Sequence, residues 1–218
     1  MQTEIRNRPA FANVLVSLEP GERLIAEADA MATMSASITM STRWSGGPMR
    51  AILKRIFGGE SLFLNEFTTE TGGEIVITQP MPGDIECIDL AGTTMFLQPG
   101  AFLACDPGVK LELGYAGFRS LIAGEGLFRL KVRGQGRVWF GAYGGIFERE
   151  VDEEYIVDSG HLVAYEPSIQ INVGMAGGII NSFLSGEGII TRVKGPGKIY
   201  MQSRNFSALA AWTNSHLW

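Results

Sequence analysis

The tripeptide Asp158-Ser159-Gly160 is the sharpest candidate for chemistry in this chain. It has the Asp-Thr/Ser-Gly form of the aspartic proteases, and the apolar run 155–157 precedes it. That reaction needs two carboxyl groups that face each other and share a proton. The corresponding positions begin with Gln98 and Glu27 and lack the tripeptide, so only a homodimer could supply the partner. Because Asp and Ser cap turns and Gly accepts positive φ, we interpret the tripeptide as a turn.

Histidine and cysteine are too sparse for most nucleophilic or metal chemistry. The chain has two of each, at His161, His216, Cys87 and Cys105, and it lacks a Gly-x-Ser-x-Gly motif. His161 is either a site residue or a partly buried strand residue, whereas His216 lies in a tail that is frayed or docks elsewhere. The cysteines are expected to be free thiols of a reducing compartment. We predict no bound metal and no cofactor.

Two glycine-rich segments have a superficial likeness to phosphate-binding loops. The segment 195–198 reads Gly-Pro-Gly-Lys, as in part of a Walker loop, but Arg192 and Ile199 stand where Gly and Ser/Thr would be needed. The Gly-Gln-Gly of 134–136 has Trp139 where a third glycine would be needed. Both segments are better interpreted as hairpin turns.

A Gly-Glu phrase occurs three times, each time before an apolar run, and its glutamates are Glu60, Glu125 and Glu187. If a pseudo-threefold axis brings these carboxylates together, they could hold a cation or a polar ligand. The alternative is a hairpin whose glutamate is solvated or accepts hydrogen bonds from backbone N–H groups. This trio is the predicted ligand site.

The same phrase indicates an internal triplication. Its copies lie about 60 residues apart, and a second glycine phrase follows each copy, at 72–73, 134–136 and 195–197. One copy of this size is marginally stable alone. We therefore predict one compact domain over 1–218, built of repeats 11–85, 86–150 and 151–212 packed about a pseudo-threefold axis.

Within the repeats, apolar residues mostly alternate with polar ones, as at 109–113 and 169–173, which predicts short strands. A short helical insert is predicted before each Gly-Glu phrase. The first, 48–57, has an apolar stripe and a basic face that carries Arg50, Lys54 and Arg55. That face could contact a membrane or a protein partner, although a helix this short more often covers a sheet.

Composition limits the functional classes. Hydrophobic residues make up 45% of the 218 residues and charged residues 19%, enough for a substantial core. The net charge of −5 opposes nucleic-acid binding. The segment 129–139 holds the one cluster that interleaves basic and aromatic side chains, with Arg129, Lys131, Arg133, Arg137 and Trp139, and it could equally be an exposed hairpin edge. Neither a signal peptide nor a spanning helix is visible, so a cytoplasmic protein is expected.

Several longer phrases resemble the bacterial DUF124 family, which is related to the mitochondrial biogenesis protein AIM24. They lie at 58–65, 82–85, 100–104 and 157–164, and the likeness runs from about Phe11 to Trp212. The resemblance implies three repeats, each like the trp RNA-binding attenuation protein (TRAP-like), in the double-stranded β-helix or jelly-roll class. It implies no enzymatic activity, and it places 158–160 in an ordinary turn.

Together these observations predict an all-β protein that acts by binding or assembly and is not an enzyme. The leading hypothesis is a self-assembling scaffold, a homo-oligomer with a membrane-peripheral form as an option. The alternative is a module that binds a small ligand or RNA in clefts between repeats or subunits. A hydrolase that uses Asp158 is the weakest hypothesis.

Overall fold

The structure is a computed structural model that describes residues 1–43, 64–98, 100–115, 128–175 and 189–216. In these ranges the regular structure is β-strand, as predicted, apart from one α-helix and a short 3-10 turn, and every pairing between named strands is antiparallel. The predicted helical inserts fall outside the described residues.

The strands form four sheets, in each of which a strand is hydrogen-bonded to the next one named. The first is β1 (Gln2–Arg6), β2 (Asn13–Leu18), β7 (Gly73–Thr78) and β4 (Met31–Met34). The second is β5 (Ile38–Arg43), β6 (Leu64–Thr69), β3 (Arg23–Glu27), β10 (Phe102–Cys105), β13 (Arg137–Gly141) and β8 (Ile85–Asp89). The third is β11 (Val109–Tyr115), β12 (Phe128–Gly134), β9 (Thr94–Leu97), β16 (Leu162–Tyr165), β19 (Gly197–Gln202) and β14 (Ile146–Val151). The fourth is β15 (Glu154–Asp158), β18 (Ile189–Lys194) and β17 (Gln170–Met175).

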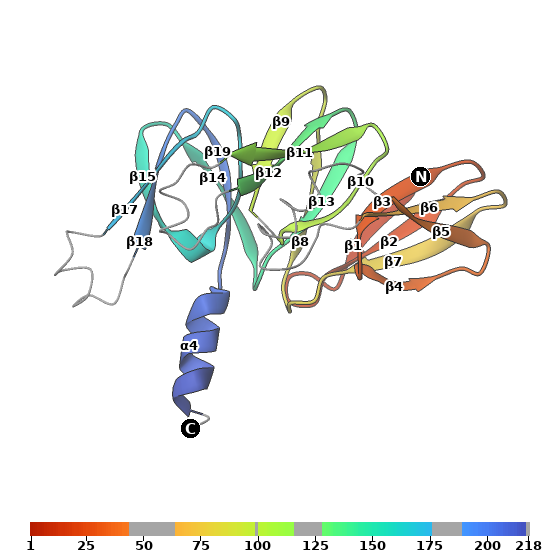
Figure 1. Ribbon diagram of the computed structural model, residues 1–218, viewed down its shortest axis with the longest axis horizontal. Helices are drawn as coiled ribbons and strands as arrows, with labels where there is room; N and C mark the ends of the chain where they lie inside the picture. Colours follow the sequence, from red (N-terminus) through yellow and green to blue (C-terminus); the bar gives the residue numbers. More distant parts are fainter. Residues whose placement is uncertain (44–63, 99, 116–127, 176–188, 217–218) are drawn as a thin grey trace.

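The order of pairing recurs along the chain. The triplets β2-β7-β4, β8-β13-β10 and β14-β19-β16 have the same connectivity, and so have β5-β6-β3, β11-β12-β9 and β17-β18-β15. Each lobe in Figure 1 combines one triplet of each kind, and the three lobes lie side by side in a row. Among the described residues, strand pairing does not join the first lobe to the last. The pseudo-threefold axis therefore stays a prediction.

Neighbouring lobes share a sheet. Strand β3 of the first lobe pairs with β10 of the second, and β9 of the second pairs with β16 of the third. All four residues of β10 and of β16 are buried, so both faces of the sheet are covered where two lobes join. Strand β2, in contrast, buries every second side chain, as the period of a sheet with one covered face requires.

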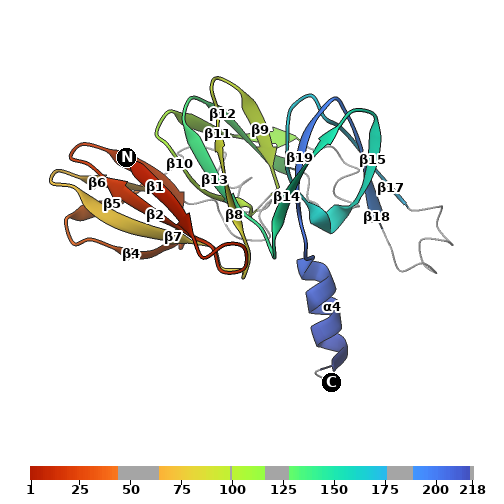
Figure 2. The ribbon, with the colours of Figure 1, turned by 180° about the vertical axis from the view of Figure 1, so that it is seen from behind.

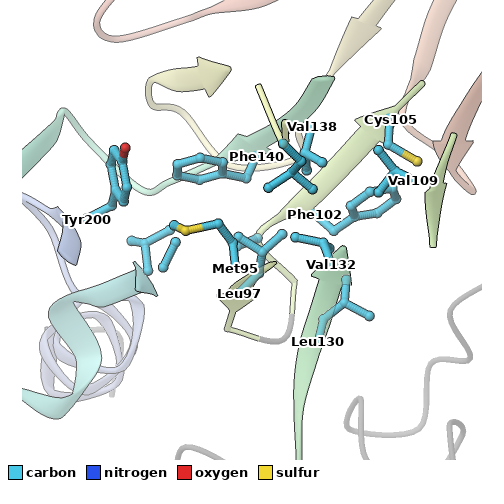
Figure 3. Packing of buried hydrophobic residues seen from close by; sticks show 14 of the residues in the cluster. Met95, Leu97, Phe102, Cys105, Val109, Leu130, Val132, Val138, Phe140 and Tyr200 are labelled. Carbon is cyan, nitrogen blue, oxygen red and sulfur yellow. The ribbon is translucent and has the colours of Figure 1, made fainter. Parts of the chain in front are cut away.

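The core of the middle lobe is continuous with both neighbours. Its cluster includes Ile25 from the first lobe and Val163, Ala164 and Tyr200 from the third. Figure 3 shows Phe140 and Tyr200 facing each other across this junction, and their ring centroids are 5.4 Å apart in an edge-to-face arrangement. Shared sheets and a shared core join the lobes into one body.

One helix in the described ranges differs from the sequence prediction. Helix α4 (Phe206–His216) follows β19 and projects away from the sheets in both Figure 1 and Figure 2. Its N-cap is Asn205, whose side-chain oxygen accepts a hydrogen bond from the backbone N–H of Ser207 at 2.9 Å. None of its residues is buried.

Candidate functional site

The predicted ligand and surface residues lie outside the described residues. These are Glu60, Glu125 and Glu187 of the Gly-Glu phrases, and Arg50, Lys54 and Arg55 of the first insert. The site is therefore built from the remaining candidates and from what the fold brings together.

Asp158 of the tripeptide is the last residue of β15. The other two residues of the tripeptide begin a short 3-10 turn, Ser159–His161. Asp158 Oδ2 accepts a hydrogen bond from Asn205 Nδ2 at 3.2 Å and lies 3.6 Å from His161 Nε2. Because Asn205 caps α4, the carboxylate holds the start of that helix against the third lobe. These contacts are with an amide and an imidazole, which is the structural role expected of a turn.

His161 is half-buried and oriented by the backbone. Its Nδ1 lies 2.7 Å from the carbonyl oxygen of Gln202, so Nδ1 carries the hydrogen in this contact. Gln202 in turn donates from Nε2 to the carbonyl oxygen of Gly160 at 2.8 Å. The histidine therefore belongs to the network that closes the turn after β15.

The two thiols differ in exposure, and neither is in a disulfide. Cys105 is buried in β10, and Cys87 is partly buried in β8. Burial raises the pKa of the Cys87 thiol to about 11, with a smaller opposing effect from Arg137. A thiol with so high a pKa is mostly protonated at neutral pH and is a poor nucleophile.

Three of the four cations in the basic cluster at 129–139 pair with carboxylates, and two of them share one carboxylate. Arg133 Nε donates to Glu112 at 2.7 Å, and Lys131 Nζ lies 3.5 Å from the same carboxylate. Hydrogen bonding to Arg133 lowers the pKa of Glu112. Arg137 Nε pairs with Asp106 at 3.1 Å. Cations that already have carboxylate partners are weak candidates for contacts with nucleic-acid phosphates.

Arg129 is engaged in a different way. Its guanidinium lies 3.8 Å from the centroid of the Phe96 ring and donates to the hydroxyl of Tyr165 at 2.6 Å. Phe96 is on β9 and Tyr165 on β16, so this contact stabilises the junction between the second and third lobes.

A small pocket of about 170 Å³ opens between the lobes, beside the first turn of α4. Its apolar lining includes Met81, Leu162 and Phe206, and its polar lining includes Gln79 and Gln202. Gln79 Nε2 donates to the carbonyl oxygen of Ala142 at 3.0 Å, and the Gln202 amide is engaged with the backbone after β15. The volume is below that of a typical site for a drug-sized ligand.

Sequence reasoning did not identify a second kind of surface, made of exposed apolar side chains at the ends of the row and on α4. Ile156 on β15 is 49% exposed and Met34 on β4 is 37% exposed, while Phe206 and Trp212 of α4 are 56% and 61% exposed. Their apolar character is typical of core positions, so sequence alone gave no signal that they are exposed.

The described ranges offer neither a metal cluster nor a membrane span. They contain no group of three or more His, Cys, Asp or Glu side chains placed to hold a metal ion. Within the same ranges, no helix is long and apolar enough to cross a bilayer.

The fold and these sites define a class of protein: an all-β chain of edge-joined antiparallel sheets, with a small inter-lobe pocket and apolar surfaces at its ends. The chain belongs to the AIM24 family, because residues 3–204 match the family described as mitochondrial biogenesis AIM24. This confirms the resemblance seen in the sequence.

Two relatives extend this assignment. The chain is 27% identical over 227 residues to an uncharacterized protein of Streptococcus pyogenes serotype M6, and the match covers 100% of this chain and 91% of that protein. It is also similar to the X-ray crystal structure of a Streptococcus pyogenes protein, with a TM-score of 0.80, 24% identity and coverage of 99% of both chains. At that identity the likeness to the crystal structure supports the fold alone.

Proposed function

We propose that this chain is a non-enzymatic scaffold protein that acts by assembling with further copies of itself and by binding partners. The observation that carries the proposal is that exposed apolar side chains lie on β4, on β15 and along α4, beside others at Phe11, Met40 and Phe147. Surfaces of this kind mark interaction sites when they are contiguous and outlined by polar residues.

The chemistry of the remaining candidates supports a non-enzymatic role. Asp158 and His161 hold the turn before β16 and the cap of α4, and the high pKa of Cys87 keeps its thiol protonated. Each group has a structural use in the fold. None of these uses requires a substrate.

Helix α4 is the second element that favours partner binding. Phe206, Leu209 and Trp212 are exposed on it, and an isolated helix of 11 residues is only marginally stable in water. A partner that covers this stripe would stabilise the helix. The membrane-peripheral form of the proposal depends on Arg50, Lys54 and Arg55 and has support from the sequence alone.

The test is native mass spectrometry, with light scattering on a sizing column, of the full chain across a range of protein concentrations. A discrete or growing assembly whose mass depends on concentration supports the scaffold. A monomer at every concentration refutes self-assembly.

The second candidate function is small-ligand binding in the inter-lobe pocket. It is favoured by the exposed ring of Phe206 at the rim, beside walls that are partly apolar. A reproducible extra mass on protein purified gently from its own host would support it. The variant Phe206→Ala should then lose that mass, whereas an exposed-residue control such as Phe147→Ala should retain it. Absence of any extra mass would count against this function.

A further inference from the structure

The two junctions between lobes are built in the same way. At the first, Ala26 of β3 pairs with Ala104 of β10, and Ile25 pairs with Cys105. At the second, Leu97 of β9 pairs with Ala164 of β16, and Phe96 pairs with Tyr165. Both junctions are antiparallel and have the same short register. The fold thus uses one edge-to-edge contact twice.

Strand β4 has the same place in the first lobe as β10 and β16 have in the others. It pairs with β7 as they pair with β13 and β19, and the register shifts after the first residue in all three cases. Each of the three strands has four residues. Strand β4 is therefore a third copy of the edge that β10 and β16 present to a preceding lobe.

Strand β15 is the matching edge at the other end of the row. It pairs with β18 as β3 pairs with β6 and β9 pairs with β12. In the described pairings, β4 and β15 each lie at the end of their sheet, whereas β10, β16, β3 and β9 each have a strand on both sides. The first and last lobes thus each present one strand of such a junction, β4 and β15, and these two strands do not pair with each other in the described part of the chain.

The register of the missing junction follows from the other two. In each of these four-residue strands, the register shift lies between the first and third residues. Met34, Cys105 and Tyr165 are the fourth residues and therefore correspond to one another. Ile156 corresponds to Ile25 and Phe96 by its pairing with the neighbouring strand. The expected pairs are Met34 with Ile156, and Thr33 with Val157.

The junction residues of β4 and β15 have larger exposed fractions than the equivalent residues of the two junctions inside the chain. Cys105 and Tyr165 are 0% and 3% exposed, but Met34 at the same position is 37% exposed. Ile25 is 5% exposed, and Ile156 at its position is 49% exposed. Apolar residues thus occupy both positions in all copies, and those of the internal junctions are buried except Phe96, which is partly buried.

The composition of β4 also fits a paired edge. Exposed edge strands are usually protected from other chains by charged residues or proline. The outer strand β1 carries Glu4 and Arg6, and the outer strand β14 carries a Glu-Arg-Glu run at 148–150. Strand β4 reads Met-Ala-Thr-Met and has no such protection.

We propose that copies of this chain assemble head to tail, with β15 of one copy added to the free edge of β4 in the next, in the register of the internal junctions. The inference rests on the self-assembly proposed above and names its interface. The contact is heterologous, so it builds either a closed ring or an open array of copies. Each sheet at a contact between copies then repeats the arrangement inside one chain.

Disulfide trapping of the full chain tests the interface. In a Cys87→Ser background, one protein carries Met34→Cys and a second carries Ile156→Cys, and the two are mixed and oxidised. Directly opposed residues of neighbouring strands bring their Cβ atoms to a separation that a disulfide can span with small adjustment. The matched control replaces Ile156→Cys by Glu154→Cys, two residues along the same strand.

The expected result is a covalent dimer in the Met34→Cys and Ile156→Cys mixture, at least about tenfold more abundant than in the control mixture. A chain that carries both cysteines should give a ladder of covalent multimers. An assembly seen by light scattering without this dimer would overturn the interface and leave self-assembly standing. A protein that remains monomeric throughout would overturn both the interface and self-assembly. If the doubly substituted chain forms only an internal disulfide, β15 pairs with β4 of the same chain, and the head-to-tail contact is refuted.

Discussion

The ion pair between Arg8 and Asp84 makes a specific prediction about stability. Arg8 lies between β1 and β2, and its Nε and Nη2 donate to the two carboxylate oxygens of Asp84 at 2.7 and 3.0 Å. Asp84 immediately precedes β8, so this pair links the N-terminal hairpin to the start of the second lobe. The perturbation is Arg8→Ala. Its matched control is Arg6→Ala, which removes an arginine that is paired with Glu4 nearby on β1.

The magnitude follows from the exposure of the two pairs. The side chain of Asp84 is 4% exposed, so Arg8→Ala leaves a buried carboxylate with only its hydrogen bond from the backbone N–H of Ile85. Breaking a fully buried pair costs about 3–5 kcal/mol. Because the Arg8 side chain is 40% exposed and water can replace part of it, we expect about 2–3 kcal/mol for this pair. Arg6→Ala should have little effect on stability, since its pair is exposed.

Thermal unfolding followed by circular dichroism measures the difference. For a chain of this length, about 1 kcal/mol shifts the midpoint by roughly 2–4 °C, so Arg8→Ala should lower it by about 4–12 °C. Combining it with Asp84→Asn should recover about 1–2 kcal/mol, because the neutral amide no longer needs a cation. Equal midpoints for Arg8→Ala and Arg6→Ala would refute the reasoning.

Three further predictions concern the backbone, the partly buried thiol and α4. Gly83→Ala should destabilise the fold by at least about 2 kcal/mol in urea unfolding, because the added Cβ would overlap the carbonyl oxygen of Ala142, whereas Gly145→Ala has room and should be nearly neutral. The raised pKa of Cys87 means that the folded protein favours the protonated thiol. Its contribution to the free energy of unfolding is complete below pH 9 and is lost as pH rises toward 11. The total loss should be about 1–2 kcal/mol once solvent screening of the partly exposed thiol is included. Cys87→Ala should remove that slope from the pH dependence of unfolding, and an unchanged slope would contradict the assignment. Trp212→Ala should change the free energy of unfolding by less than about 0.5 kcal/mol, because the side chain is exposed, and a larger loss would mean that α4 packs on the body of the protein.

Local pattern was sufficient to predict the fold class, because alternation is a local property of a strand with one covered face. The alternating runs at 109–113 and 169–173 fall on β11 and β17, in the second and third lobes. Pairing between lobes could not be predicted in the same way. Whether β3 meets β10 depends on residues nearly 80 positions apart, and their apolar character is compatible with any buried neighbour.

Two elements lay outside the predicted pattern for different reasons. Strand β1 precedes the first repeat and is held by β2, so no repeat landmark marks it. Helix α4 has a local signal that could have been used: an Asn N-cap at position 205, followed by the alanine-rich segment 208–211, which favours a helix. A prediction that requires an apolar face packed on a sheet does not find α4, because none of its residues is buried.

The candidate site shows the same limit of local reasoning. The tripeptide at 158–160 enters a short 3-10 turn, although Asp158 makes no side-chain cap there and Gly160 does not have a positive φ. The link from Asp158 through Asn205 to α4 joins positions 47 residues apart and required the structure. The ion pairs of the basic cluster likewise join distant positions, with Glu112 on β11 and Asp106 just after β10.

Met34 and Ile156 are two residues whose exposure differs from the burial that their sequence context predicts. An apolar residue in a strand predicts burial, and at the equivalent positions Cys105, Tyr165 and Ile25 are buried as predicted. The same inference fails at Met34 and Ile156, and also at Met40 and Phe147, which are exposed on β5 and β14. Exposed apolar edges promote unwanted association. In the first sheet, the outer strand β1 carries charged residues and the opposite outer strand β4 carries none, so a strand that covers β4 would remove an exposed apolar edge. In the head-to-tail proposal that strand is β15 of another copy, and the contact would cover Met34 and Ile156 as the internal junctions cover Cys105, Tyr165 and Ile25.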